Sequence, residues 1–228
     1  MKNSKRNVSL AARINVIRAS VMGANDGIVS VAGIVIGVAG AHASSYAIFL
    51  AGFAGMLAGT ISMAMGEWVS VSTQRDSEKR AVIREQAALK ENYAGEFNFI
   101  KNKYQKTGIS SELAHKATQE MLSKDPLSVA TRERYGFNPK EQTSAIAAAI
   151  ASMISFPIGS LLPLIAITSI NISYRIIATV GAVTVALLIT GGAAAVLGNA
   201  NKGKAMLRNV VSGLLTMLIT YLIGSVFA

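Results

Sequence analysis

A long stretch of this sequence carries almost no charge, and that feature restricts the possible folds more than any other. Between Gln142 and Ala200 the only charged side chain is Arg175, whereas residues 73–141 are dense in acidic and basic groups. A soluble domain needs charge on every outer face, and only 15% of this chain is charged. The sequence therefore predicts an integral membrane protein.

Five apolar segments are long enough to cross a bilayer as helices. A helix rises about 1.5 Å per residue, so roughly 20 residues span about 30 Å of hydrocarbon. The predicted spans cover residues 14–41, 45–71, 144–167, 174–197 and 206–227. The expected fold class is an all-α integral membrane protein with five transmembrane helices and a small cytoplasmic helical insert between spans two and three. The expected divisions are residues 1–73, with spans one and two, residues 74–141, which form the insert, and residues 142–228, with spans three to five.

Local signals predict where the helices of the insert begin and end. Residues 73–92 have a helical composition and could continue span two. Ser111 and the pair Asp125–Pro126 are typical helix starts, and Gly136 is a typical helix end. The insert is therefore expected to be a small helical domain.

Basic residues alternate from one side of the predicted spans to the other. They lie before span one, throughout the insert and between spans four and five, and are absent from residues 41–44 and 224–228. Because positive charge favours the cytoplasmic side, we expect a multi-pass protein of the cell membrane with its N-terminus and insert inside and its C-terminus outside. The net charge of +10 could instead indicate nucleic-acid binding. The alternation favours the membrane interpretation, so no nucleic-acid partner is expected.

The sequence contains no nucleophile motif and no nucleotide-binding lysine motif. Neither His42 nor His115 lies in a nucleophile motif, and no glycine-rich phosphate loop occurs. Cysteine is absent, so no thiolate metal site can form. We therefore expect no enzyme activity and no permanently bound cofactor.

Glycine pairs on the first two spans predict close approach of helices. The pairs are spaced at i, i+4 and comprise Gly23/Gly27, Gly33/Gly37 and Gly55/Gly59. Small residues at this spacing let helix backbones touch in lipid. The pattern fits packing within one chain and a subunit interface equally well.

Asp26 is the most informative residue, because it lies in the middle of an otherwise apolar span. A carboxylate at that depth is costly unless it faces a cavity, a proton or a cation. Gly23, Gly27 and Ser30 share its helical face, which is small and polar like the wall of a pore. A structural hydrogen bond to a neighbouring helix is the alternative. The position favours an ion-binding role for Asp26.

Span two carries a stripe of residues spaced three or four apart. Met56, Thr60, Met63 and Glu67 share one helical face, which is expected to lie opposite Asp26. Methionine is often only a flexible core filler, and that reading stays open. Thioether sulfur together with carboxylate oxygen suits a borderline divalent ion such as Fe²⁺ or Mn²⁺ better than Ca²⁺ or Na⁺. Met63 and Glu67 are therefore candidate metal ligands.

Several motifs resemble those of the vacuolar iron transporter family, whose bacterial members are often labelled iron or manganese transporters. They are Met-Gly-Ala-Asn-Asp-Gly (22–27), Ile-Ser-Met-Ala-Met-Gly-Glu-Trp-Val-Ser-Val (61–71) and Ser-Thr-Gln-Arg-Asp (72–76), with weaker matches at 155–164 and 207–213. The resemblance implies a homodimer of five-span subunits, with the first spans lining a pore at the two-fold axis. It also implies metal export from the cytosol coupled to inward proton flow.

The resemblance assigns roles to single residues of the spans. Asp26 matches the pore aspartate of the family, and Met63 matches its pore methionine. Family members often carry a glutamate two turns before that methionine, and this chain has Gly55 there.

In the insert, the resemblance implies metal ligands on several helices. The matching positions are Glu85, Glu96, Glu120, Met121 and Glu133. The second carboxylates expected beside Glu85 and Glu96 are replaced by Ala88 and Phe99. The resemblance therefore implies a single weaker site in the insert rather than a store for several ions.

The function predicted from these observations is export of Fe²⁺ or Mn²⁺ from the cytosol by proton antiport, as part of iron and manganese homeostasis. The expected partners are divalent metal ions, protons, the lipid bilayer and a second copy of the chain. Protonation of Asp26 from outside would release the ion, because a neutral carboxyl group holds a cation poorly. Gly55 leaves open a passive metal channel or a metal-sensing membrane module without proton coupling. A membrane scaffold whose basic insert binds anionic lipid or a partner is a further alternative.

Overall fold

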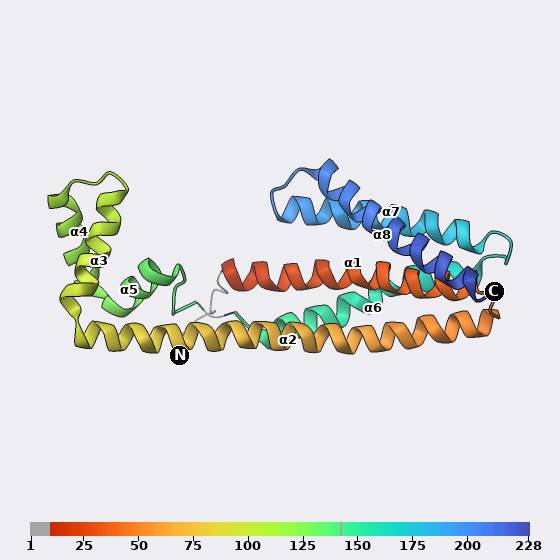
Figure 1. Ribbon diagram of the computed structural model, residues 1–228, viewed down its shortest axis with the longest axis horizontal. Helices are drawn as coiled ribbons and strands as arrows, with labels where there is room; N and C mark the ends of the chain where they lie inside the picture. The colour runs from red at the N-terminus through yellow and green to blue at the C-terminus, as the bar shows by residue number, and fades with distance from the viewer. Residues whose placement is uncertain (1–9, 142) are drawn as a thin grey trace, which may run out of the picture. The chain divides into compact units, whose positions relative to one another are not determined.

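The fold is known from a computed structural model that describes residues 10–141 and 143–228, so part of the basic N-terminal segment and Gln142 lie outside the described residues. In these two ranges the regular elements are all α-helices (Figure 1). They are α1 (Leu10–Gly40), α2 (Ser45–Glu91), α3 (Tyr93–Lys106), α4 (Ser111–Lys124), α5 (Pro126–Tyr135), α6 (Ala145–Ser169), α7 (Arg175–Leu197) and α8 (Lys202–Val226). Five of them, α1, α2, α6, α7 and α8, are long and apolar enough to cross a membrane. The predicted all-α, five-span fold class is confirmed.

Several helices extend beyond the predicted spans, and α1 begins at Leu10 rather than at residue 14. The 47 residues of α2 reach about 70 Å, because the helix continues through residues 73–91 without a break. The last span begins at Lys202 rather than Met206, because the Asn201 side chain caps α8 by accepting a hydrogen bond of 3.1 Å from the Lys204 amide.

Contacts divide the chain into two compact units. The membrane unit comprises residues 14–69 and 145–228, and the insert unit comprises residues 70–144 with the described residues before 14.

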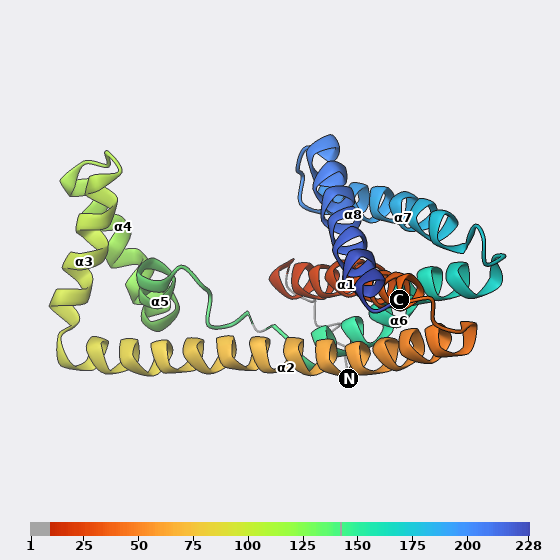
Figure 2. The same ribbon diagram turned by 45° about the vertical axis from the view of Figure 1, so that its right-hand side comes forward.

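The membrane unit is built around α1. Val31, Ala32 and Val35 on this helix are completely buried. Around them lies one apolar core that takes side chains from all five long helices, including Ile28, Ile36, Ile48, Met56, Leu164, Ile167, Val183, Leu187 and Met217. Helices α7 and α8 pack along each other, as the two views in Figures 1 and 2 show. Because this core surrounds α1, it gives the helix a fixed place in the membrane unit.

Glycine lets α1 contact α6 and α8 backbone to backbone. A Cβ on Gly27 would collide with the carbonyl oxygen of Phe156, and one on Gly159 would collide with that of Ala24. Near the C-terminal end of α1, a Cβ on Gly224 of α8 would collide with the carbonyl oxygen of Gly37. The glycine spacing of span one is therefore explained by packing within one chain.

The insert unit contains a small helical group with its own apolar core. Ile100, Leu122 and Ala130 are buried at its centre, one from each of α3, α4 and α5. Helices α4 and α5 begin at Ser111 and Pro126, where the sequence predicted helix starts, because the side chains of Ser110 and Asp125 cap them. Gly136 ends α5 with a φ of 80°, a conformation that glycine adopts without strain.

Candidate functional site

Asp26 lies midway along α1 with its side chain on the open surface of the chain. Its Oδ1 accepts a hydrogen bond of 2.7 Å from Ser30 Oγ, one helical turn further on. Within the described residues Asp26 forms no ion pair, and the serine hydroxyl supplies no positive charge. A carboxylate in this position can hold a cation or a proton that approaches from the exposed face of α1.

Asn25, the neighbour of Asp26, faces the interior of the membrane unit. Its Oδ1 accepts hydrogen bonds from Thr190 Oγ1 of α7, at 3.3 Å, and from Asn209 Nδ2 of α8, at 3.0 Å. These bonds join three helices and fix the rotation of α1 about its axis, so they also fix the direction of Asp26. This cluster was not predicted from the sequence. The sequence signal that could have predicted it is the presence of two amide side chains, Asn25 and Asn209, within apolar spans.

Glu67 is buried and paired with an arginine of α1. Its Oε2 accepts a bond of 3.1 Å from Arg18 Nη2. The Arg18 guanidinium also donates to Asn15 Oδ1 at 3.2 Å and approaches Met22 Sδ at 3.4 Å. From the sequence alone, Arg18 counts only among the basic residues at the start of span one. In the structure, a guanidinium is surrounded by carboxylate, amide and thioether groups that could otherwise bind a metal ion.

The methionine stripe of α2 divides into two kinds of position. Met56 belongs to the apolar core, which fits the core-filler reading, whereas Met63 is only half-buried. One turn beyond Met63, the stripe meets α1 at Arg18, which is two turns from Asp26, or about 12 Å along the helix. The assignment of Met63 and Glu67 as metal ligands therefore stays a prediction.

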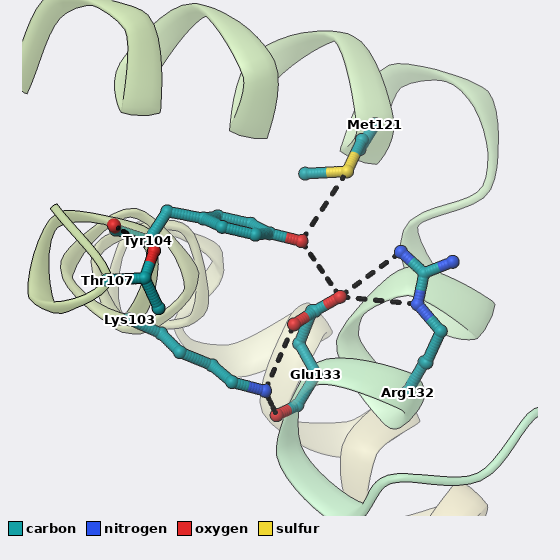
Figure 3. Close-up of polar contacts among 6 residues, drawn as sticks. All are labelled: Lys103, Tyr104, Thr107, Met121, Arg132 and Glu133. Carbon is teal, nitrogen blue, oxygen red and sulfur yellow. Dashed lines mark hydrogen bonds and ion pairs between the residues drawn. The ribbon is translucent and has the colours of Figure 1, made fainter. Parts of the chain in front are cut away.

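The structure brings most of the predicted insert ligands against cations of the chain itself. Glu85 and Glu96 both form ion pairs with Arg134 of α5. Glu133 binds Lys103 and Arg132 and accepts a hydrogen bond of 2.9 Å from the Tyr104 hydroxyl (Figure 3).

Figure 3 also places Met121, whose sulfur lies 3.8 Å from the Tyr104 hydroxyl, while Glu120 is exposed on α4. Residues 10–141 and 143–228 contain no group of three or more histidine or carboxylate side chains positioned to hold a metal ion.

Burial and neighbouring charges shift the pKa values of these carboxylates in opposite directions. Burial raises the pKa of Glu85 to about 7, and the neighbouring Glu96 carboxylate adds to the rise. Burial also opposes ionisation of Glu133, but hydrogen bonds from Lys103, Tyr104 and Arg132 outweigh it and lower the pKa of Glu133. Glu133 is therefore held as an anion by its own partners.

The chain has five candidate spans and, midway along one of them, a carboxylate without a cationic partner among the described residues. These features define a multi-pass membrane protein and are typical of an ion-translocating helix bundle. The chain belongs to the VIT family, whose model matches residues 17–225. This match confirms the resemblance seen in the sequence.

Relatives similar to this chain include proteins of plants and an amoeba. "Vacuolar iron transporter homolog 5" of Oryza sativa subsp. japonica is 34% identical over 215 residues, which cover 94% of this chain and 81% of the relative. "Vacuolar iron transporter" of Acanthamoeba castellanii is 32% identical over 209 residues, which cover 91% and 77%. "Vacuolar iron transporter homolog 3" of Arabidopsis thaliana is 34% identical over 229 residues, which cover 98% and 91%.

Proposed function

We propose that this protein transports divalent metal ions, with Fe²⁺ or Mn²⁺ as cargo, and exports them from the cytosol in exchange for protons. The observation that carries the proposal is the Asp26 carboxylate, exposed midway along a span with a serine hydroxyl as its partner. Membership of the VIT family supports it, as do relatives that are named iron transporters.

The exchange follows from the chemistry of a carboxylate. Ionised Asp26 attracts a cation, and protonated Asp26 holds one poorly, so a metal ion and a proton compete for the same group. A proton that arrives from the outer side would release the ion to that side. The lone hydroxyl of Ser30 orients the carboxylate without neutralising it.

A homodimer would complete this site. One carboxylate leaves a divalent ion half neutralised, whereas two related by a two-fold axis match its charge. The exposure of Asp26 on the open face of α1 supports such an arrangement, because the same face of a second chain could meet it. Half-buried Met63 would add a soft sulfur donor along the route.

A passive metal channel is the second candidate, and one observation favours it. At Gly55, where relatives in the resembled family often carry a glutamate, the side chain of Ile34 packs against the helix. An apolar contact there offers no group that could exchange a proton.

Transport by the purified protein in proteoliposomes tests the proposal. Mn²⁺ and Fe²⁺ entry would be measured with the vesicle interior acidic and with equal pH on both sides, against protein-free vesicles. Proton antiport predicts accumulation above equilibrium only with the acidic interior, together with a rise in internal pH. Equal entry under both conditions would indicate the passive channel, and no entry would leave the scaffold interpretation.

Orientation in the membrane is tested separately with two tags. The charge alternation predicts that a tag after Ala228 is accessible only from outside and one within residues 104–111 only from inside. Accessibility of both tags from the same side would contradict the proposed orientation.

A further inference from the structure

The insert unit contains one arginine between two carboxylates of different helices. Arg134 Nε lies 3.2 Å from Glu85 Oε2 of α2, and Arg134 Nη2 donates to Glu96 Oε2 of α3. The guanidinium lies over the Phe99 ring, 4.0 Å from its centroid. A planar guanidinium has donors on several edges and a face that stacks on aromatic rings, and this site uses both properties.

The two carboxylates form a buried acceptor pair. The Glu85 side chain is only 1% exposed, and the Glu96 side chain is 12% exposed. Glu85 Oε1 is buried and has no hydrogen-bond partner. A buried carboxylate oxygen without a partner is unusual and shows that the cluster has acceptor capacity that Arg134 does not fill.

The adjacent carboxylate is already saturated. Glu133 is surrounded by Lys103, Arg132 and the Tyr104 hydroxyl, as Figure 3 shows, and Lys103 also donates to the Glu133 backbone carbonyl. The charge of Glu133 is therefore already compensated. The carboxylate oxygen that could still accept a hydrogen bond or a cation belongs to the Glu85–Glu96 pair.

We propose that Arg134 is the resident cation of the insert, occupying the position between Glu85 and Glu96 that a divalent ion would otherwise take. The insert then folds without metal and does not collect the cargo, so transport proceeds through the membrane unit alone. The resemblance implied weak binding for a different reason, the loss of carboxylates at Ala88 and Phe99. In the structure, Phe99 instead supports the arginine that replaces the ion.

The proposal predicts that removing the guanidinium creates a metal site. Arg134→Met keeps an unbranched stem of similar length but no charge, which leaves two carboxylates and the unpartnered Glu85 oxygen without a cation. Burial and the Glu96 carboxylate already raise the pKa of Glu85 to about 7, so the measurement is made above that pH, where a proton does not neutralise the pair. There a divalent ion should bind, because an uncompensated buried charge is strongly unfavourable.

Mn²⁺ binding to the full chain in detergent tests this prediction, with Asp26→Asn present in every variant so that a site at Asp26 does not contribute. Electron paramagnetic resonance would count bound Mn²⁺, and thermal unfolding would be followed in EDTA and in Mn²⁺. With Arg134 intact, we expect the same melting temperature in both media and no bound ion. With Arg134→Met, we expect a lower melting temperature in EDTA, a rise with Mn²⁺ and a single additional bound ion. The Asp26→Asn background also separates the two proposals, because failure of Asp26 as a transport residue would leave this result unchanged.

Three variants control for charge and position. Arg132→Met removes a neighbouring arginine while Lys103 still holds Glu133, and it should create no site. Arg134→Lys keeps a positive charge and should create none either. Adding Glu85→Gln to Arg134→Met should remove the gained ion.

Two results would overturn the proposal. One is an Mn²⁺ ion bound to the chain with Arg134 intact and lost on Glu85→Gln. The other is an Arg134→Met chain that gains no ion. If Arg134→Met does not fold, the chain with Arg134 intact, with and without Glu85→Gln, still provides the first of these tests.

Discussion

The carboxylates of the insert unit and Asp26 of the membrane unit have very different partners. Glu85 and Glu96 share Arg134, and Glu133 has a lysine, an arginine and a tyrosine hydroxyl. Asp26 accepts one hydrogen bond from Ser30. An unpaired charge is far more costly in a membrane than near water, yet the unpaired carboxylate is the one midway along a span. The insert carboxylates are paired within the chain, and the open position of Asp26 supports the proposal that it binds an ion.

Glu67 is an intermediate case. It lies in a predicted span like Asp26, but it is buried and paired with Arg18 like the glutamates of the insert. By the same reasoning, its charge is used first to hold α1 and α2 together.

The largest effect is expected from Asp26→Asn. The amide can still accept the Ser30 hydrogen bond, so the chain should fold, but it can neither neutralise a cation nor titrate. Metal transport in proteoliposomes should fall on the order of 100-fold or more, which corresponds to about 2.8 kcal/mol. Ser30→Ala keeps the charge and should retain most of the transport. If Asp26→Asn transports at the wild-type rate with unchanged pH dependence, then Asp26 does not bind the transported ion, and its difference from the insert carboxylates has no functional meaning.

A loss of stability is expected from Arg18→Gln. It leaves the buried Glu67 charge without its partner and should destabilise the protein by about 1–2 kcal/mol, less than for a fully buried pair, because Arg18 is 46% exposed. The double variant Arg18→Gln, Glu67→Gln should recover most of this loss, as thermal unfolding in detergent would show. If Arg18→Gln leaves the stability unchanged, Glu67 does not depend on an arginine partner and resembles Asp26 instead.

A change of selectivity is expected from Met63→Leu. The swap nearly conserves volume and should cost under about 1.5 kcal/mol in packing. Loss of the sulfur should shift the Fe²⁺ to Mn²⁺ transport ratio away from iron by up to about tenfold, or 1.4 kcal/mol. Met56→Leu is the matched control, since Met56 lies in the apolar core and its replacement should leave the ratio unchanged. Equal shifts in the two variants would show that packing, not sulfur, sets the ratio.

The smallest effect is expected from Tyr104→Phe, which removes one of the hydrogen bonds to Glu133. It should cost about 1 kcal/mol of stability and leave transport unchanged. Because the folded state lowers the pKa of Glu133 from 4.5, its contribution is complete above that value and is lost as the pH falls. The variant should therefore lose less stability than the wild type on acidification. Identical acid unfolding curves would show that Lys103 and Arg132 hold Glu133 without help from Tyr104.

The sequence was enough for the features that depend on local composition. Hydropathy predicted the five spans, and capping residues predicted the starts of α4 and α5, because lipid solvation and helix caps act on neighbouring residues. It was not enough for the pairing of charges. Arg18 and Glu67 are 49 positions apart, and Arg134 meets Glu96 across 38. Such pairs depend on how the helices pack.

The methionine stripe shows a second limit. Met56 and Met63 have nearly the same helical phase, so periodicity assigned both to one face. Their difference in burial comes from the side chains that surround each of them, which the spacing does not contain.

The interlocked glycines of α1 and α6 restrict how this protein can move. Backbone atoms at Gly27 and Gly159 already contact the opposite helix, so neither helix can slide or rotate past the other without a steric clash. Under the proposed function, a cycle that exposes Asp26 first to one side and then to the other would carry α1 and α6 together. The movement has to occur where α1 meets side chains that can change rotamer, and the Arg18–Glu67 contact between α1 and α2 is such a place.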